Sequence, residues 1–461
     1  MLQAVLQTVD ARRDQAVSAL KEFLAIPSVS AQPQHKADMQ RCAQWLAEQL
    51  SLAGLEVKVM PVAGGKGHPA VVAKNKHEPG RPTVLYYGHY DVQPPEPLEL
   101  WTTPPFEPSM RNGAIYARGA ADDKGQVWAH VEAILAWQAH GGLPVNLTLL
   151  IEGEEEIGSE NLGEFVAAHR VDLRADIAVI SDTILFARGI PAITYSVRGL
   201  VYMELTVTAA AVDLHSGLYG GAVPNPLNIL CELLATLHDR DGRVNIPGFY
   251  EKVIPPSDEE RLMWAKLPFD EKQYAADLKL PALAGEIGYS ALERLWARPA
   301  CDINGITGGY QGPGAKTVIA SKASAKVSMR LVPNQDAVAV RDAFALAMRQ
   351  RCPSCVKLEM ECFGQAPAVL VPLHSHGIDL ASEAIKIGYG IRPVLIRGAA
   401  SIPVVELIKS NLGIDTLLVG FALPDDCVHS PNEKFDLDAL HAGARTAAAL
   451  YERLAKLEVR R

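Results

Sequence analysis

The feature that most constrains the fold is a series of short, nearly uninterrupted apolar runs that alternate with helix-like segments. Residues 83–92 (TVLYYGHYDV), 146–153 (NLTLLIEG) and 176–182 (DIAVISD) have the length of strands, whereas residues 37–54 and 124–141 have the length of helices. Strands that are apolar on both faces are typical of parallel sheets covered by helices on both sides. The first 200 residues therefore predict an α/β domain with a mostly parallel sheet.

The rhythm of the sequence changes after about residue 199. Three expected strands and two expected helices indicate a smaller α+β unit, within which residues 240–300 are rich in Pro, charge and Trp and look like an insertion. Helices and a short apolar strand, residues 416–421 (TLLVGF), resume after about residue 367. We therefore expect a first domain built from residues 1–198 and 367–461, with residues 199–366 inserted as a lid.

Composition and charge restrict the class of partner. The chain has 461 residues, of which 48% are hydrophobic, and 44 basic against 53 acidic residues give a formal net charge of -9. A general affinity for nucleic acid or for an anionic membrane needs clustered Lys and Arg, and no run of about 18 apolar residues could span a membrane. The expected partner is therefore a small molecule.

The N-terminal segment and the cysteines favour a cytoplasmic protein. Charged residues at positions 10–14 interrupt what would be the apolar core of a signal peptide, and the apolar positions of residues 5–24 repeat at helical spacing up to Pro27. Seven cysteines, an odd number scattered over a long chain, do not form a disulfide framework. Cys352 and Cys355 have the spacing of a zinc or redox pair, but no second pair accompanies them, and we interpret them as a loop.

Polar side chains that can bind metal or move protons follow several of the expected strands. They are His89 and Asp91, Glu155 and Glu156, Asp182, and His429, which follows the strand 416–421 and a loop. In open α/β sheets, sites form beyond the carboxyl ends of the strands. These side chains, distant in sequence, are therefore expected to converge.

Crowding of acids at the end of residues 146–153 indicates a bound cation. Residues 152–156 read Glu-Gly-Glu-Glu-Glu, and two carboxylates 4 Å apart repel by roughly 4 kcal/mol at an effective dielectric of about 20. A divalent metal removes this cost. Imidazole and carboxylate ligands without thiolate suit zinc, and manganese or cobalt could occupy a similar geometry.

Each of these pieces also has a structural interpretation when it is taken alone. A histidine at a strand end is commonly a hydrogen-bonded structural residue, and a run of glutamates is commonly a solvated turn. Asp122, in the run Asp-Asp-Lys-Gly, could be a helix N-cap. The metal interpretation is favoured because these coincidences would have to recur at several strand ends.

Taken in order, the motifs resemble those of the M20 family of metallopeptidases, and within it the branch of cytosolic nonspecific dipeptidase and carnosine dipeptidase. The family motifs are His89-Tyr90-Asp91, residues 119–125 (GAADDKG), residues 152–159 (EGEEEIGS), Ser181-Asp182 and residues 424–430 (PDDCVHS). Three further segments support the branch, namely residues 213–217 (DLHSG), 313–319 (PGAKTVI) and 330–334 (RLVPN).

The resemblance implies a catalytic α/β domain that holds two metal ions. In such a centre Asp122 bridges the ions, His89 and Asp182 complete one site, and Glu156 and His429 complete the other. The first and last segments of the chain, 1–198 and 367–461, would then form the catalytic domain.

The resemblance also assigns roles beside the metals. Glu155 is implied as the general base that takes a proton from the attacking water and returns it to the leaving amine, and Asp91 as the partner that orients His89. The lid of residues 199–366 would also mediate a homodimer, in which His215 stabilises the oxyanion of a neighbouring subunit's site. Arg330 would bind the substrate's carboxylate, with Thr317 and Ser401 adding hydrogen bonds.

One departure from the branch bears on the substrate. Relatives usually read Arg-Glu-Gly-Gly-Ser-Ile-Pro where residues 397–403 read Arg-Gly-Ala-Ala-Ser-Ile-Pro, so a carboxylate is missing and Ala replaces Gly twice. We predict a hydrolase of dipeptides or short peptides with a free C-terminal carboxylate. An N-acyl or succinyl-type amino acid deacylase stays open because the same metal chemistry serves it, as does a metal-binding protein without catalysis, against which Glu155 argues. No glycine-rich nucleotide-binding loop follows any strand.

Overall fold

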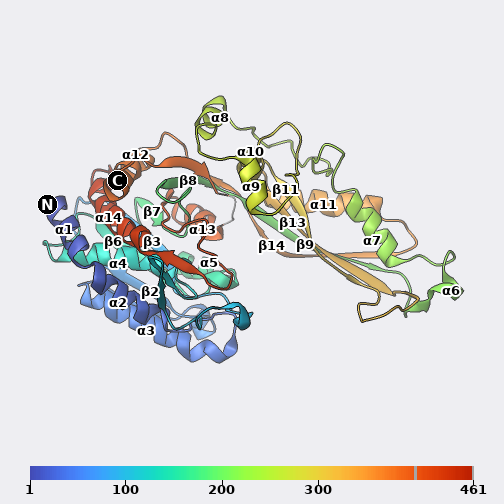
Figure 1. Cartoon of the computed structure of the whole chain (residues 1–461), viewed down its shortest axis with the longest axis horizontal. Coiled ribbons are helices and arrows are strands. Elements are labelled where there is room, and N and C mark those ends of the chain that lie inside the picture. Colours follow the sequence, from blue (N-terminus) through green and yellow to red (C-terminus); the bar gives the residue numbers. More distant parts are fainter. Residues whose placement is uncertain (399–401, 459–461) are drawn as a thin grey trace. The chain divides into compact units, whose positions relative to one another are not determined.

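The computed structural model describes residues 1–398 and 402–458, which divide into two units (Figure 1). Unit 1 comprises Met1–Tyr195, Val371–Ile396 and Leu407–Arg461. Unit 2 comprises Ser196–Leu370 and Arg397–Glu406. The chain thus leaves unit 1 twice, first for the long segment Ser196–Leu370 and then for the short segment Arg397–Glu406.

Unit 1 contains most of a nine-stranded sheet with the order β1-β2-β6-β3-β7-β17-β8-β15, in which β16 also pairs with β8. Strand β15 and the last two residues of β8 fall in unit 2. The central neighbours β6, β3, β7 and β17 are parallel, and β1 and β2 are antiparallel. A small sheet, β18-β5-β4, accompanies it. The strands are β1 (Glu56–Met60), β2 (Ala70–Lys74), β3 (Thr83–His89), β4 (Ser109–Arg111), β5 (Ala114–Tyr116), β6 (Asn146–Glu152), β7 (Ile177–Ile180), β8 (Ala192–Val197), β15 (Val369–Leu370), β16 (Val394–Arg397), β17 (Thr416–Leu418) and β18 (Lys434–Asp436).

Helices cover this sheet, and its central strands are buried along almost their whole length because of that cover (Figure 1). Helix α14 packs against α1, α4 and α12, and α3 packs against β1 and β2. The helices are α1 (Leu2–Ala11), α2 (Arg13–Leu24), α3 (Lys36–Leu52), α4 (Lys124–Gln138), α5 (Leu162–Ala168), α12 (His376–Tyr389), α13 (Pro403–Leu412) and α14 (Leu437–Leu454). The predicted fold class, an α/β sheet domain with an inserted α+β unit, is confirmed.

Unit 2 has a four-stranded antiparallel sheet, β11-β13-β9-β14, and a short ladder of β10 and β12. Strand β9 alternates buried and half-exposed residues, and its buried side chains share one core with α7 and α11. Its elements are β9 (Gly199–Thr208), β10 (Leu214–His215), α6 (Ser216–Tyr219), α7 (Pro226–Ala235), α8 (Asp258–Trp264), α9 (Glu271–Asp277), α10 (Ala291–Trp296), β11 (Ala300–Gly308), β12 (Val318–Ile319), β13 (Lys322–Leu331), α11 (Ala337–Arg351) and β14 (Lys357–Ala366).

Three details differ from the sequence-based expectation. The helix expected up to Pro27 is divided into α1 and α2 at Arg12, whose guanidinium binds Glu132 at 2.8 Å. One of the three strands expected after residue 199, that of residues 316–332, is divided between β12 and β13 because the two halves pair with different partners. Strand β8 was not expected. Within residues 1–398 and 402–458, no helix has the length and apolar character that crossing a membrane requires.

Candidate metal centre

Two groups of side chains in unit 1 have the spacing of metal ligands. One consists of His89, Asp122 and Asp182 and the other of Asp122, Glu156 and His429, and within each group the candidate ligand atoms lie within 4.8 Å of one another. We call them the first and the second triplet. Asp122 belongs to both triplets, so one carboxylate joins them.

The distances show how Asp122 divides its two oxygens. Its Oδ1 lies 3.0 Å from His89 Nε2, and its Oδ2 lies 2.9 Å from His429 Nε2. In the first triplet, His89 Nε2 is also 3.9 Å from Asp182 Oδ2. In the second, His429 Nε2 is 3.2 Å from Glu156 Oε2. Each oxygen of Asp122 therefore faces a different histidine.

The register of the parallel strands brings these residues together. His89, the last residue of β3, pairs with Glu152 at the end of β6. Ile180 at the end of β7 is level with Tyr87 of β3, and Asp182 follows two residues later. The carboxyl ends of the central strands therefore meet at one edge of the sheet, which is the place that the strand-end rule predicts.

Asp91 connects His89 to the turn that carries the glutamates. Its Oδ1 lies 3.3 Å from His89 Nδ1, and its carboxylate accepts the backbone N–H groups of Glu155 and Glu156 at 3.3 and 3.1 Å. The two glutamates open a 3-10 turn, Glu155–Ile157, and the first amides of such a turn attract an anion. One buried carboxylate thus orients a histidine of the first triplet and a turn of the second.

Glu155 and Asp182, which accept no hydrogen bond from a histidine, have raised pKa values. Burial, with further contributions from Asp182 and Asp122, raises the pKa of Glu155 to about 9, although His89 acts in the opposite direction. Burial and Asp122 raise the pKa of Asp182 to about 7. The negative charge that these residues would carry together is therefore strongly opposed in this arrangement.

His429 and Asp122, by contrast, are favoured in their charged forms. Hydrogen bonds to Asp122 and Glu156 raise the pKa of His429 to about 10. Burial would raise the pKa of Asp122, but His429 and His89 outweigh it and hold that pKa below its usual range. The cluster therefore favours positive charge at the positions between its carboxylates.

The chemistry of the donor set fits divalent metal ions. Apart from the ion-pair contacts given above, the buried Nε2 of His89 has no hydrogen-bond partner among the described residues, although it is aimed at two carboxylates. A neutral imidazole nitrogen in such a position is a good metal ligand. Nitrogen and oxygen donors without thiolate suit zinc, manganese or cobalt.

The remaining predicted site residues lie in unit 2 or outside the described residues. His215 is exposed on β10, and its Nδ1 accepts the backbone N–H of Gly217 at 3.0 Å. Thr317 is close to it in the ladder, since its carbonyl accepts the N–H of Ser216 at 3.1 Å. Arg330 is half-buried on β13. Ser401 lies outside the residues that the structure describes.

Two buried carboxylates that support the centre were not singled out from the sequence. Glu433 accepts hydrogen bonds from Arg118 and from three backbone N–H groups of residues 119–122. Glu152 accepts hydrogen bonds from the hydroxyls of Tyr87 at 2.5 Å and Ser159 at 2.8 Å. Glu152 stands in the acidic run and could have been noticed there, whereas nothing local distinguishes Glu433.

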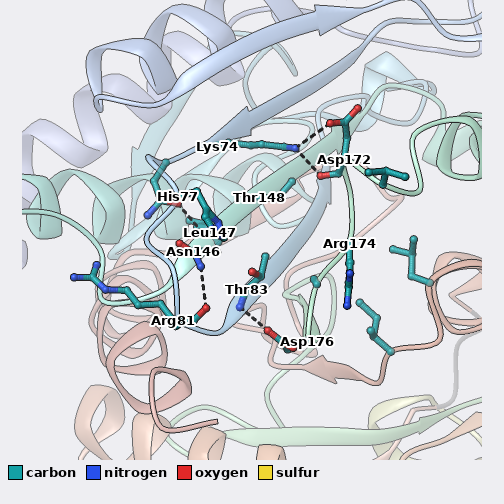
Figure 2. A pocket seen from close by; sticks show the side chains of 16 residues that line it. Lys74, His77, Arg81, Thr83, Asn146, Leu147, Thr148, Asp172, Arg174 and Asp176 are labelled. Carbon is teal, nitrogen blue, oxygen red and sulfur yellow. Dashed lines mark hydrogen bonds and ion pairs between the residues drawn. The ribbon is translucent and has the colours of Figure 1, made fainter. Parts of the chain in front are cut away.

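A cavity of about 690 Å³ lies elsewhere in unit 1, at the amino ends of β3 and β6 (Figure 2). Its polar groups already pair with one another: Lys74 binds the carbonyl of Asp172 at 2.6 Å, and Asp176 accepts the N–H of Thr83 at 2.7 Å. Asn146 holds the neighbouring loop through its side chain. None of the predicted site residues lines this cavity, so we assign it no part in the chemistry.

The strand ends of this α/β domain carry two histidine–carboxylate triplets that share one aspartate. This is the ligand set of a hydrolase with two divalent metal ions. The family model described as Peptidase family M20/M25/M40 matches residues 85–453. The chain therefore belongs to this metallopeptidase family, and the resemblance in the sequence motifs is confirmed.

Relatives of similar length support this assignment. The chain is 31% identical to the human Beta-Ala-His dipeptidase over 99% of its own length and 93% of the relative's. It is 30% identical to the Cys-Gly metallodipeptidase of Schizosaccharomyces pombe over 99% of both chains. Among solved structures, an M20 family metallo-carboxypeptidase from Sulfolobus solfataricus is 32% identical, with a TM-score of 0.87 and coverage of 96% of this chain and 99% of that chain. The di-peptidase Dug1p of Saccharomyces cerevisiae is 28% identical, with a TM-score of 0.86 and coverage of 99% of both chains.

A buried histidine lies behind the centre and makes the fold sensitive to acid. His130 of α4 is fully buried, with Nε2 2.8 Å from the hydroxyl of Ser181 and Nδ1 2.9 Å from that of Tyr451. Burial lowers the pKa of His130 from 6.5 to about 3. Between these values the unfolded chain takes up a proton that the folded chain does not, so stability falls as the pH drops from about 6.5 towards 3.

The unfolding free energy of the wild type should decrease as the pH falls. We expect His130→Asn to reduce the slope of this decrease by up to about 1.4 kcal/mol per pH unit, which corresponds to one proton. The measurement is urea unfolding of the chelator-treated protein between pH 6.5 and 4. His77→Asn, which changes an exposed histidine, should leave the slope as it is in the wild type. Equal slopes for the wild type and His130→Asn would contradict the expectation.

Proposed function

We propose that this chain hydrolyses the peptide bond of dipeptides or short peptides with a free C-terminal carboxylate, with two zinc ions as its native metals. Manganese or cobalt would serve the same ligands. The observation that carries the proposal is the sharing of Asp122 between two triplets, because a carboxylate with one oxygen towards each ligand group can bridge two ions. The names of the relatives, which include dipeptidases and a carboxypeptidase, support the choice of substrate class.

The proposed ligands are His89 and Asp182 for one ion, Glu156 and His429 for the other, and Asp122 for both. Two bound ions supply positive charge that polarises the scissile carbonyl and lowers the pKa of the attacking water. Asp91 holds the imidazole of His89 in the orientation that keeps its Nε2 directed at the centre.

Glu155 is the proposed general base. It lies three residues beyond the end of β6, and the burial that raises its pKa makes its carboxylate a better proton acceptor than an ordinary glutamate. Positive charge at the triplets favours its ionised form before the reaction. It then takes the proton from the water and delivers it to the leaving amine.

Unit 2 is proposed as the lid and dimerisation domain, and Arg330 as the residue that binds the substrate's carboxylate. Burial, followed by the like charge of Arg330, lowers the pKa of Arg198 to about 10. Positive charge concentrated in this way favours an anionic group nearby, and a guanidinium fork suits a carboxylate. Thr317 and Ser401 are proposed to add hydrogen bonds to the same carboxylate.

A cytoplasmic location is also proposed, because all seven cysteines are free.

His215 is the proposed oxyanion donor. Its Nδ1 accepts a backbone hydrogen bond, so in the neutral ring the proton resides on Nε2, which is then a donor. The side chain is exposed, as a residue that serves a neighbouring subunit of a homodimer needs to be. The proposal therefore places a donor, and not a base, at this position.

Glu155→Gln should lower kcat by roughly 10²- to 10⁴-fold, because the amide cannot accept the proton. Metal content, measured by atomic absorption, should stay close to that of the wild type, since Glu155 belongs to neither triplet. Glu160→Gln, an exposed change in the same loop, serves as the control and should keep wild-type turnover. Substantial activity of Glu155→Gln would show that the mechanism is wrong.

A hydrolysis screen tests the substrate class. Free dipeptides, the same dipeptides with an amidated C-terminus, and N-acyl or N-succinyl amino acids are offered to the enzyme with zinc or manganese. Free dipeptides should be cleaved, and amidation should raise KM because the partner of Arg330 is removed. Cleavage of the acyl substrates alone would replace the dipeptidase proposal by that of a deacylase.

A mixture of His215→Ala and Glu155→Gln proteins tests the shared site. Each variant alone should be nearly inactive, whereas exchange of subunits should restore up to about a quarter of wild-type activity, since half of the dimers are mixed and each has one complete site. Activity of the mixture is followed over time after both proteins are combined. Failure to recover activity, despite subunit exchange seen with labelled protein, would refute a site completed in trans.

A further inference from the structure

The carboxylate of Glu433 is enclosed by the loop that ends in Asp122. It is fully buried, and each of its oxygens accepts two hydrogen bonds. Oε2 accepts from Arg118 at 2.7 Å and from the N–H of Gly119 at 3.0 Å. Oε1 accepts from the N–H groups of Ala121 and Asp122 at 2.9 and 3.2 Å. The backbone that leads into Asp122 is therefore held by a side chain more than 300 residues away.

The small sheet explains how these distant segments meet. Strand β18 pairs with β5, with Lys434 opposite Tyr116, and the N–H of Ala117 binds the carbonyl of Glu433 at 3.1 Å. The loop that carries Asp122 follows β5, and the loop that carries His429 precedes β18. Both ligand loops thus start from one ladder, and the Glu433 side chain connects them at that point.

The conformation of the loop leaves little room for another arrangement. Gly119 has φ +84°, and a Cβ there would lie 2.6 Å from Val92 Cγ1. Arg118 is buried as well, and its second nitrogen binds the carbonyl of Pro94 at 3.3 Å. The peptide groups of residues 119–122 are therefore oriented around one carboxylate.

We propose that Glu433 is a positioning residue of the metal centre, which sets the place of Asp122 relative to His429 and hence the separation of the two metal ions. This inference rests on the proposed function, since it takes Asp122 as the shared ligand. A carboxylate that bridges two ions must be held within about 0.5 Å of its working position. Four hydrogen bonds to one buried side chain provide such a restraint.

Glutamine at this position is a sharp test because it has the same size and only one acceptor oxygen. Whichever way the amide is turned, its NH2 group faces two donors, either Arg118 and Gly119 or Ala121 and Asp122. The loop must shift to relieve these contacts. Loss of such a supporting partner typically costs about 10- to 100-fold in metal affinity.

A matched control exists in unit 2. Glu286 is buried and accepts two hydrogen bonds from Arg298, both of 2.7 Å. Glu286→Gln therefore removes the charge of a buried carboxylate from a comparable arginine pair, but it does so in the unit that holds neither triplet. Any general effect of a damaged buried ion pair should be seen in both variants.

The experiment compares the wild type, Glu433→Gln and Glu286→Gln by competition for Zn²⁺ with a chromophoric chelator and by the visible spectrum after loading with Co²⁺. Hydrogen exchange of the Ala121 and Asp122 amides in chelator-treated protein is a third readout. For Glu433→Gln we expect an affinity for at least one ion that is about 10- to 100-fold lower, an altered Co²⁺ spectrum and faster exchange, with kcat reduced more than KM is changed. Glu286→Gln should match the wild type in metal binding and spectrum.

Wild-type affinity and spectrum of Glu433→Gln would overturn the inference, even if the variant were less stable to heat. If Glu433→Gln does not fold, Glu433→Asp carries the test, because it keeps the charge but is too short to reach all four donors. Wild-type metal binding by Glu433→Asp would then overturn the inference. His429→Ala separates the two proposals: if it loses an ion while the Glu433 variants do not, only the inference fails, and if the wild type binds no ions, the proposed function fails.

Discussion

Repulsion among buried carboxylates is the interaction on which the arrangement of unit 1 depends. Asp122, Asp182, Glu155 and Glu156 lie close enough to one another to shift each other's pKa values. Two such charges at 4 Å cost roughly 4 kcal/mol at an effective dielectric of about 20, and a protein of marginal stability cannot hold several of them without compensation. Positive charge between the carboxylates is therefore a condition of the fold at this edge of the sheet.

The groups that compensate this negative charge, the two histidines, come from separate elements of the fold. His89 ends β3, His429 precedes β18, and Asp122 lies between their imidazoles with one oxygen towards each. Asp91 and Glu433 use backbone amides to hold the loops that carry the ligands. The same charge balance that makes the cluster tolerable makes it a metal centre, because divalent ions satisfy it better than protons do.

Much of the fold and of the centre could be predicted because the signals are local. A strand buried on both faces is apolar throughout, as β3 and β6 are, and a polar residue directly after such a strand belongs to the functional edge of the sheet. His89, Asp182 and Glu156 were predicted in this way. Glu433 and His130 were not predicted because nothing in the neighbouring sequence indicates their partners, which are 311 and 51 residues away. The roles of Arg330, Thr317 and Ser401 remain predictions.

The sequence by itself determined the chemistry that the chain can support: which residues are acids and imidazoles, which segments are strands, and which family motifs they form. The tertiary structure alone decided that Asp122 divides its two oxygens between His89 and His429, and that Asp91 and Glu433 hold the loops around it. The physical reason is that residue types and periodicity are properties of neighbours along the chain. Distances of about 3 Å between segments hundreds of residues apart are set only when the sheet register and the loop hydrogen bonds have formed.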